Sequence, residues 1–351
     1  MKILIIQQKM IGDVLTSSIL FEALKQKHPE SDLHYLINSH TYPVVENNPY
    51  IDKFIFITPE IEKSKLKFFS FLKTIRKENY NILIDVYSKT SSHLISLFSG
   101  SKIKISKHKS YTSFIYTNTF KESKSLKTNA GLAIENRLQL LKPIIKSTVS
   151  PIRPKIYLKK HEIQTSRQFL KDYNIDLCKP LFMISVLGSD KNKTYPLPYM
   201  AQLIDVIVLE NKAQILFNYL PEQLDDAKAV YSLCKKETQQ YIYFEVFGKN
   251  LRDFLAITKN CDALIGNEGG AVNMAKALNI PTFTVFSPWI KKETWAMFEN
   301  GTTNTSVHLK DFMPNLFEGK ETKDLKSIYS ALYLKFKPKL FSKALIQFIK
   351  Q

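Results

Sequence analysis

The stretch Ala263-Leu-Ile-Gly-Asn-Glu-Gly-Gly-Ala-Val-Asn-Met-Ala275 decides the fold class of this chain. Its apolar start is typical of a buried strand, and Ala271–Leu278 has the spacing of a helix. The glycines between them let the backbone turn tightly and approach a ligand closely. Because a helix N-terminus offers free N–H groups, this order predicts a parallel α/β unit with an anion-binding turn at the carboxyl edge of its sheet.

The same alternation continues on both sides of this stretch, and the βαβ rhythm favours parallel sheets covered by helices. Strands are expected at Lys2–Ile6, Leu33–Ile37, Lys53–Ile57, Ile82–Val86, Phe182–Val186, Ala213–Phe217, Tyr241–Val246, Ala263–Ile265 and Thr282–Phe286. A lysine- and serine-rich segment, Ser99–Thr128, interrupts the first half and predicts a long basic loop.

The prolines between Pro143 and Pro154 indicate the approach to a linker between two domains. We therefore expect two Rossmann-like domains facing each other across a cleft, residues 1–165 and 166–325. The amphipathic segment Lys339–Lys350 predicts a C-terminal helical part, residues 326–351, that packs back on the first domain. Attachment of this helix to a membrane surface is the alternative.

Composition narrows the class of protein further. The 351 residues carry a net charge of +18, which calls for an anionic partner: nucleic acid, an anionic membrane surface or a phosphorylated substrate. A lysine-rich surface without one particular partner is the alternative. The three widely spaced cysteines exclude a disulfide framework. The short apolar run at the N-terminus and the lack of any longer one predict a cytoplasmic protein without a transmembrane helix.

Four segments carry candidate site residues. Asp13, after Gly12, is either a helix N-cap or a general base at the carboxyl edge of the first sheet. Lys191 and Lys193, in the segment that begins at Gly188, either neutralise a phosphate or belong to a solvated loop. Glu222 follows a strand, so it is either a surface residue or part of a cleft.

In the fourth segment, Glu268 is placed to accept hydrogen bonds from a sugar or ribose hydroxyl, although Gly269-Gly270 can also form only a tight turn. The segment matches neither a P-loop nor the GxGxxG pattern of nicotinamide-binding proteins. No histidine spacing supports a zinc site, so neither a metal nor a cofactor is expected.

These segments, in this order, resemble glycosyltransferase family 9, the ADP-heptose:lipopolysaccharide heptosyltransferases. Ile11-Gly-Asp-Val14 resembles the family's opening turn, and Gly188 to Pro196 resembles its Gly-Ala-Ser…Lys-Arg-Trp-Pro segment, with Lys193 as the lysine. Ile265 to Ala275 resembles its Asn-Asp-Thr-Gly-Pro-x-His-x-Ala signature. Here the signature is changed: Glu268-Gly269-Gly270 stands for Asp-Thr-Gly, and Asn273 stands for the histidine.

The resemblance implies a GT-B fold and an inverting, metal-independent transfer from a nucleotide-sugar, an ADP-sugar being favoured, to an anionic glycolipid. Asp13 would be the base, and Lys193 would stabilise the departing diphosphate. The donor would bind the second domain and the acceptor the first, near the inner face of the cytoplasmic membrane and without nucleic acid. The implied donor-binding residues are Gly188, Lys191, Glu222, Asn267, Glu268, Gly269, Gly270 and Asn273. The expected acceptor-binding residues are Lys9, Gly12, Lys102 and Lys104.

Two alternatives remain at this stage. One is a catalytically silent protein that binds nucleotide-sugars in surface-glycan assembly, and the other is a GT-B enzyme that acts on a nucleotide-sugar without a lipid acceptor.

Overall fold

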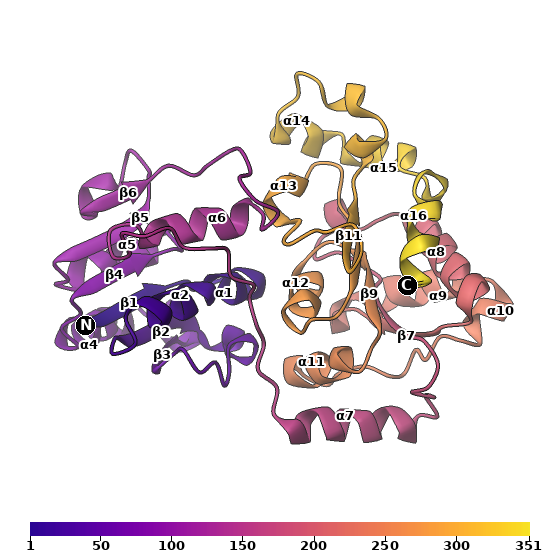
Figure 1. Ribbon diagram of the computed structural model, residues 1–351, viewed down its shortest axis with the longest axis horizontal. Coiled ribbons are helices and arrows are strands. Elements are labelled where there is room, and N and C mark those ends of the chain that lie inside the picture. Colours follow the sequence, from indigo (N-terminus) through magenta and orange to yellow (C-terminus); the bar gives the residue numbers. More distant parts are fainter. The chain divides into compact units, whose positions relative to one another are not determined.

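The computed structural model describes all residues, 1–351, and they form two compact units, Met1–Tyr157 and Leu158–Gln351 (Figure 1). The junction comes earlier than the sequence predicted. The expected boundary at 165/166 falls inside helix α7 (Lys160–Asp172), which packs against α11 (Leu251–Lys259) and so belongs entirely to the second unit.

The first unit contains a six-stranded parallel sheet in the order β3-β2-β1-β4-β5-β6. Its helices connect the strands in the βαβ manner that the sequence predicted. The strands are β1 (Lys2–Ile6), β2 (Asp32–Asn38), β3 (Lys53–Ile57), β4 (Ile82–Asp85), β5 (Ile103–Lys107) and β6 (Asn118–Phe120). The helices are α1 (Ile11–Ser17), α2 (Ile19–Lys27), α3 (Pro59–Lys63), α4 (Lys65–Lys77), α5 (Thr90–Phe98) and α6 (Leu132–Leu138).

The expected basic loop 99–128 is wrong in part, because β5 and β6 extend the sheet through it. Ile105 and Ser106 of β5 are buried beside β4, whereas Lys104 and Lys107 are only half-buried. Only the middle of β5 is buried, as in a strand near the margin of a sheet, and the lysines conceal the strand in the sequence.

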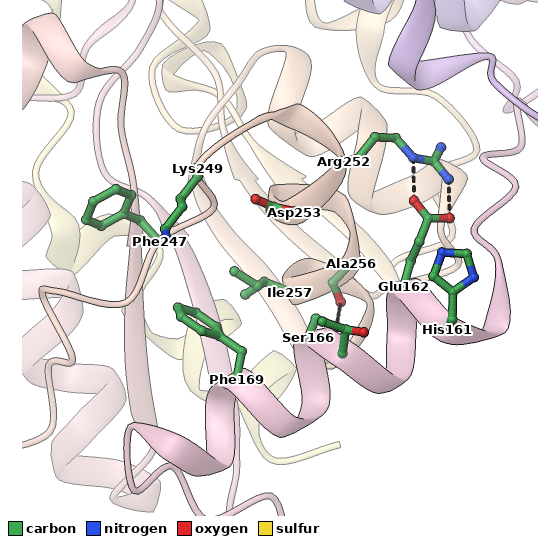
Figure 2. A pocket seen from close by; sticks show the side chains of 11 residues that line it. His161, Glu162, Ser166, Phe169, Phe247, Lys249, Arg252, Asp253, Ala256 and Ile257 are labelled. Atoms are coloured by element: carbon green, nitrogen blue, oxygen red, sulfur yellow. Dashed lines mark hydrogen bonds and ion pairs between the residues drawn. The ribbon is translucent and has the colours of Figure 1, made fainter.

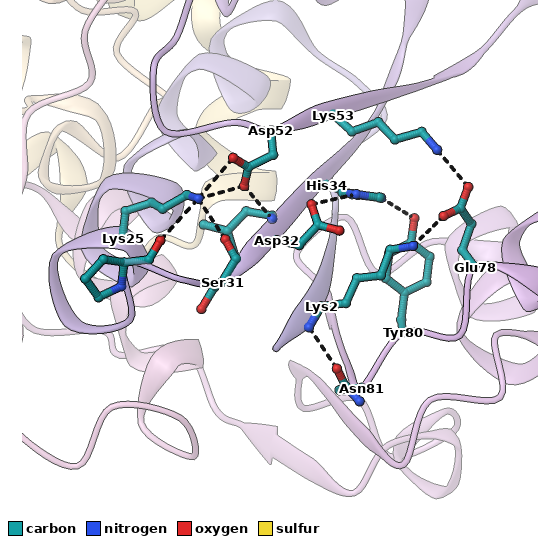
Figure 3. A network of polar contacts seen from close by, with 12 residues as sticks. Lys2, Lys25, Ser31, Asp32, His34, Asp52, Lys53, Glu78, Tyr80 and Asn81 are labelled. Atoms are coloured by element: carbon teal, nitrogen blue, oxygen red, sulfur yellow. Dashed lines mark hydrogen bonds and ion pairs between the residues drawn. The ribbon is translucent and has the colours of Figure 1, made fainter.

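Ion pairs and hydrogen bonds close the amino edge of this sheet (Figure 3). The Glu78 carboxylate, directly after α4, forms ion pairs with Lys2 of β1 and Lys53 of β3. These two cations lower the pKa of the carboxyl group to about 2. Next to them, the His34 ring contacts both the Tyr80 hydroxyl and the Asp32 carboxylate. The polar side chains at the amino edge therefore stabilise the sheet, so the carboxyl edge is the one available for a ligand-binding site.

The second unit contains a five-stranded parallel sheet in the order β11-β10-β9-β7-β8. The strands are β7 (Leu181–Ser185), β8 (Gln214–Asn218), β9 (Ala263–Asn267), β10 (Thr282–Val285) and β11 (Asn304–Val307). The other helices are α8 (Leu197–Asn211), α9 (Leu224–Leu233), α10 (Lys236–Gln239), α12 (Gly270–Ala277), α13 (Lys292–Trp295), α14 (Thr322–Ser327), α15 (Tyr329–Lys335) and α16 (Ser342–Ile349). The strand expected at Tyr241–Val246 is absent, because only Ile242 bridges to β8.

The C-terminal helix packs within the second unit, contrary to the sequence prediction. Helix α16 lies against α8, and Leu345 is buried there. The rings of Phe341 and Phe348 contact that of Phe283 on β10, and this aromatic cluster explains where the apolar face of the segment is buried. No helix of the chain is both long enough and apolar enough to cross a membrane.

Candidate functional site

The carboxyl edge of the first sheet carries Asp13. After β1 the chain turns into α1, and Asp13 lies in the first turn of this helix without forming a side-chain cap. The N-cap alternative is therefore wrong. Instead, Nη2 of Arg137 lies 2.6 Å from Oδ1 of Asp13, while Nε of the same guanidinium donates to Ser17 and Nη1 donates to the Ala133 carbonyl. Arg137 thus fixes the position of the Asp13 side chain through a charge-assisted hydrogen bond.

Lys9 and Gly12 lie at the same edge as Asp13, between β1 and the first turn of α1. Nζ of Lys9 lies 2.7 Å from Oε1 of Glu62, and this contact raises the pKa of the lysine. The carbonyl of Gly12 accepts a hydrogen bond from Thr16.

Lys102 and Lys104 are placed differently from the expectation. They lie at the start of β5, where the backbone N–H of Lys104 donates to Thr117, so they are at the amino end of the strand. At about 3.3 Å per residue, the carboxyl end of β5 at Lys107 is about 17 Å beyond Lys102 and about 10 Å beyond Lys104. These two lysines are therefore not beside Asp13, whereas Lys109, beyond the end of β5, is bonded to the Ser88 carbonyl at the carboxyl edge.

A buried carboxylate, Asp85, ends β4 at this edge. The Tyr116 hydroxyl donates to its Oδ2 at 2.6 Å, and the Ser88 backbone N–H donates to its Oδ1 at 2.7 Å. Burial raises the pKa of Asp85. Its hydrogen bonds hold the loop after β4, a role that no local sequence pattern indicates.

In the second unit the segment after β7 folds back on itself. A Cβ atom at Gly188 would lie only 2.4 Å from the Lys193 carbonyl oxygen, so only glycine allows this approach. The Gly188 N–H also donates to the Thr194 hydroxyl. As a result, Nζ of Lys193 lies 3.7 Å from Oε1 of Glu268, whereas Lys191 is exposed.

Glu268 is the most unusual group at this edge. Its side chain is buried, with 7% exposure for the residue, and its Oε1 has no hydrogen-bond partner. Burial raises the pKa of the carboxyl group, and Lys193 partly opposes this effect. The next residue, Gly269, has φ = 151° and open space where a side chain would be, and Gly270 begins α12. A buried carboxylate with one unpaired oxygen, beside an open helix N-terminus, can receive a hydroxyl-bearing anionic ligand.

Three other predicted donor-binding residues lie nearby in sequence or space, but they differ in what they can offer. The fully buried Asn267 side chain accepts from the Tyr195 N–H at 2.6 Å and donates to the carbonyls of Ser185 and Val186. Its amide is thus used by the fold, and we assign it a positioning role. Asn273 is buried in α12, and Glu222 is exposed.

Two residues that the sequence did not single out complete this site. The Trp289 ring lies 5.8 Å from Nζ of Lys193 and 4.8 Å from Nζ of Lys326, on α14. The indole N–H donates to the Asn192 carbonyl, which fixes the ring. Trp289 therefore lies next to two cations near Glu268, although neither Trp289 nor Lys326 stands close to the glycine turn in sequence.

A cavity of about 360 Å³ lies between α7 and α11 (Figure 2). Arg252 makes a bidentate pair with Glu162 on one side, and Phe169 and Phe247 line the other. None of the predicted site residues lines it. We also find no group of three or more His, Cys, Asp or Glu side chains that could hold a metal ion.

Two α/β units with parallel sheets, each with polar groups at the carboxyl edge, have the architecture of GT-B glycosyltransferases. The chain belongs to glycosyltransferase family 9 (heptosyltransferase), whose model matches residues 68–322. This range includes Lys193 and Glu268, and it begins after Asp13.

Individual relatives agree with this family. The chain is 24% identical to lipopolysaccharide heptosyltransferase 1 of Campylobacter coli, over 82% of this chain and 84% of the relative. Two solved structures share the fold. One is a family 9 glycosyl transferase from Veillonella parvula, with a TM-score of 0.74 and 15% sequence identity; the match covers 95% of this chain and 97% of the other. The second is ADP-heptose lps heptosyltransferase II of E. coli, with a TM-score of 0.69 and 16% sequence identity; the match covers 96% of this chain and 99% of the other.

Proposed function

We propose that this enzyme is an inverting, metal-independent glycosyltransferase that moves a sugar from a nucleotide-sugar to a lipopolysaccharide-like acceptor. The observation that carries the proposal is the buried Glu268 carboxylate, which lies beside Lys193 and the open start of α12 and whose Oε1 has no hydrogen-bond partner. A nucleotide-sugar offers hydroxyl groups that can donate to the Glu268 carboxylate. It also carries a diphosphate that Lys193 and the start of α12 can bind.

On the donor side, the N–H groups at Gly270 and the Lys193 ammonium would hold the diphosphate. Glu268 would accept hydrogen bonds from sugar hydroxyls. As the glycosidic bond breaks, negative charge grows on the diphosphate, and fixed positive groups stabilise it there without a metal ion. Lys326, held near the same Trp289 ring as Lys193, would add a second cation.

On the acceptor side, Asp13 would remove the proton from the attacking hydroxyl. The hydroxyl oxygen forms its bond to the anomeric carbon on the side opposite the diphosphate, which leaves with the electron pair of the broken bond, so the configuration inverts. The 2.6 Å contact with Arg137 supports this assignment, because it orients the carboxylate. Lys9 and Gly12, at the same edge, would help to bind the acceptor.

Heptose and lipopolysaccharide are proposed because the Campylobacter coli relative is a lipopolysaccharide heptosyltransferase. An E. coli heptosyltransferase of the same fold has been solved with ADP, so ADP is the nucleotide to test first. The acceptor would be met at the inner face of the cytoplasmic membrane, where such a lipid carries exposed phosphates.

Thermal-shift measurements with ADP, UDP, GDP and their sugars test the donor assignment, since a ligand that binds only the folded state raises the melting temperature. We expect a selective shift with ADP or an ADP-sugar, and its loss in the Lys193→Ala variant. A shift with UDP or GDP compounds alone would replace the base of the donor. Folded protein that responds to none of them would contradict the proposal.

A further inference from the structure

Two neighbouring helices of the first unit expose apolar side chains that the core does not use. On α4, Leu66 is 83% and Phe69 is 56% exposed, and on α5 the side chains of Leu94, Leu97 and Phe98 are exposed as well. The two helices pack against each other, so these side chains form one surface.

These exposed residues do not belong to the helix faces that pack against the sheet. The inner face of α4 already packs Phe71, Leu72 and Ile75 into a core cluster, and Ile95 does the same for α5. Each helix therefore has a second apolar side that faces away from the sheet. Contiguous exposed apolar surface on a soluble unit marks an interaction site more often than chance placement.

Aromatic side chains extend this surface toward the carboxyl edge of the sheet. The short 3-10 helix η2 (Ser113–Ile115) packs against α5, and it exposes Phe114 to 81%, while the preceding Tyr111 is exposed to 69%. Asp13 lies at this same edge. We call these side chains, together with those of α4 and α5, the α4–α5–η2 surface.

Within α4, α5 and η2 the charged side chains are all positive, although Glu60 and Glu62 lie on α3, which packs against α4. No aspartate or glutamate occurs in residues 63–77, which include α4, or in residues 86–121, which include α5 and η2. Exposed cations in these two ranges include Lys65, Lys67, Lys73, Arg76, Lys77, Lys89 and Lys102. Such a surface is complementary to an anionic partner.

We propose that the α4–α5–η2 surface docks this enzyme onto an anionic lipid bilayer. The apolar side chains would enter the headgroup region, and the lysines would contact lipid phosphates. This inference rests on the proposed lipid acceptor, because docking would bring that lipid toward the edge where Asp13 lies.

Two other occupants fit less well. Single-stranded nucleic acid binds through aromatic rings and cations, which leaves exposed leucines such as Leu66 and Leu97 without a partner. A second copy of the chain on a two-fold axis would place the same lysines opposite one another, and their like charges would repel. A bilayer uses both the aliphatic side chains and the cations.

The test is sedimentation with two kinds of vesicle, pure phosphatidylcholine and phosphatidylcholine mixed with phosphatidylglycerol. We expect binding to the mixed vesicles, weakened by salt. The double variant Leu66→Ser/Leu97→Ser should bind about tenfold more weakly, and Lys65→Gln/Lys67→Gln weaker by about fivefold per lysine. The matched controls Leu209→Ser, at a position 75% exposed on α8, and Lys235→Gln should bind as wild type does.

Every other outcome overturns the assignment. The proposal fails if the wild type ignores mixed vesicles, if it binds pure phosphatidylcholine equally well, or if the variants bind as well as the controls. It also fails if the variants instead abolish self-association in ultracentrifugation or binding to single-stranded RNA. The ADP-induced thermal shift, measured on the same samples, reports the proposed function separately. Vesicle binding without that shift would leave the surface assigned and remove the donor proposal.

Discussion

The substitution Glu268→Gln should change the stability of the ligand-free protein and its affinity for the donor in opposite directions. The carboxylate is buried, one of its oxygens lacks a hydrogen bond, and its only cationic contact, Lys193, is 3.7 Å away. An unsatisfied buried polar group costs about 1–3 kcal/mol. Because glutamine keeps the shape and removes the charge, we expect the free energy of unfolding of the ligand-free protein to rise by about 1–2 kcal/mol at pH 8. For a unit of this size the melting temperature then rises about 2–4 °C per kcal/mol.

The pH dependence of the stability change caused by Glu268→Gln provides a second, independent test. The folded-state pKa of Glu268 is raised above its ordinary value of 4.5, so the carboxyl group binds its proton more tightly in the folded than in the unfolded state. The buried Glu268 carboxyl group therefore does not destabilise the fold below its ordinary pKa. Its destabilising effect grows as the pH rises towards the raised pKa of the folded state. The stability gain of Glu268→Gln should vanish near pH 4 and be largest at pH 8. The exposed Glu237→Gln serves as the control.

Donor binding should move in the opposite direction. A hydrogen bond to a charged group contributes about 1.5–3 kcal/mol, so Glu268→Gln should raise the Kd of the nucleotide-sugar about 10- to 100-fold in calorimetric titration. Melting scans of both proteins across pH complete the assay. The reasoning is refuted if the variant melts below wild type at pH 8 and binds the nucleotide-sugar equally well.

Three further predictions follow from the same geometry. Asn267→Ala leaves the buried Tyr195 N–H unpaired and should lower the free energy of unfolding by about 3 kcal/mol in urea titrations; an unchanged midpoint would contradict the positioning role. Arg137→Gln should lower kcat at least tenfold while the Kd of the donor stays constant, and equal kcat values would show that Asp13 needs no orientation. Transfer should continue in excess EDTA, whereas strict dependence on added magnesium or manganese would contradict the role of Lys193.

The repeating local patterns were predictable from the sequence. The strand, turn and helix around Gly269 are found where the apolar run and the glycines placed them. The turn at Gly188 was also anticipated, because glycine is scarce in this chain and marks positions where the backbone must approach another segment. These features depend on neighbouring residues, which a single sequence displays directly.

The errors and omissions concern contacts between distant segments. Arg137 reaches Asp13 across 124 positions, and no local pattern indicates such a pairing. Lys102 and Lys104 were grouped with the acceptor by charge alone, but the sheet places them at the amino end of β5. Asn267 has a residue type suited to a ligand, and its use as a clamp between β7 and β9 emerges only from the packed sheet.

The most direct test of the account is the transfer reaction itself, with wild type and Asp13→Asn compared. Purified protein, the nucleotide-sugar selected by thermal shift and a truncated lipopolysaccharide acceptor are mixed, and the mass of the lipid is followed by mass spectrometry. The account predicts that wild type adds one sugar residue per acceptor, and that Asp13→Asn adds none while binding the donor with unchanged Kd. Transfer at the wild-type rate by Asp13→Asn would contradict the assignment of Asp13 as the base.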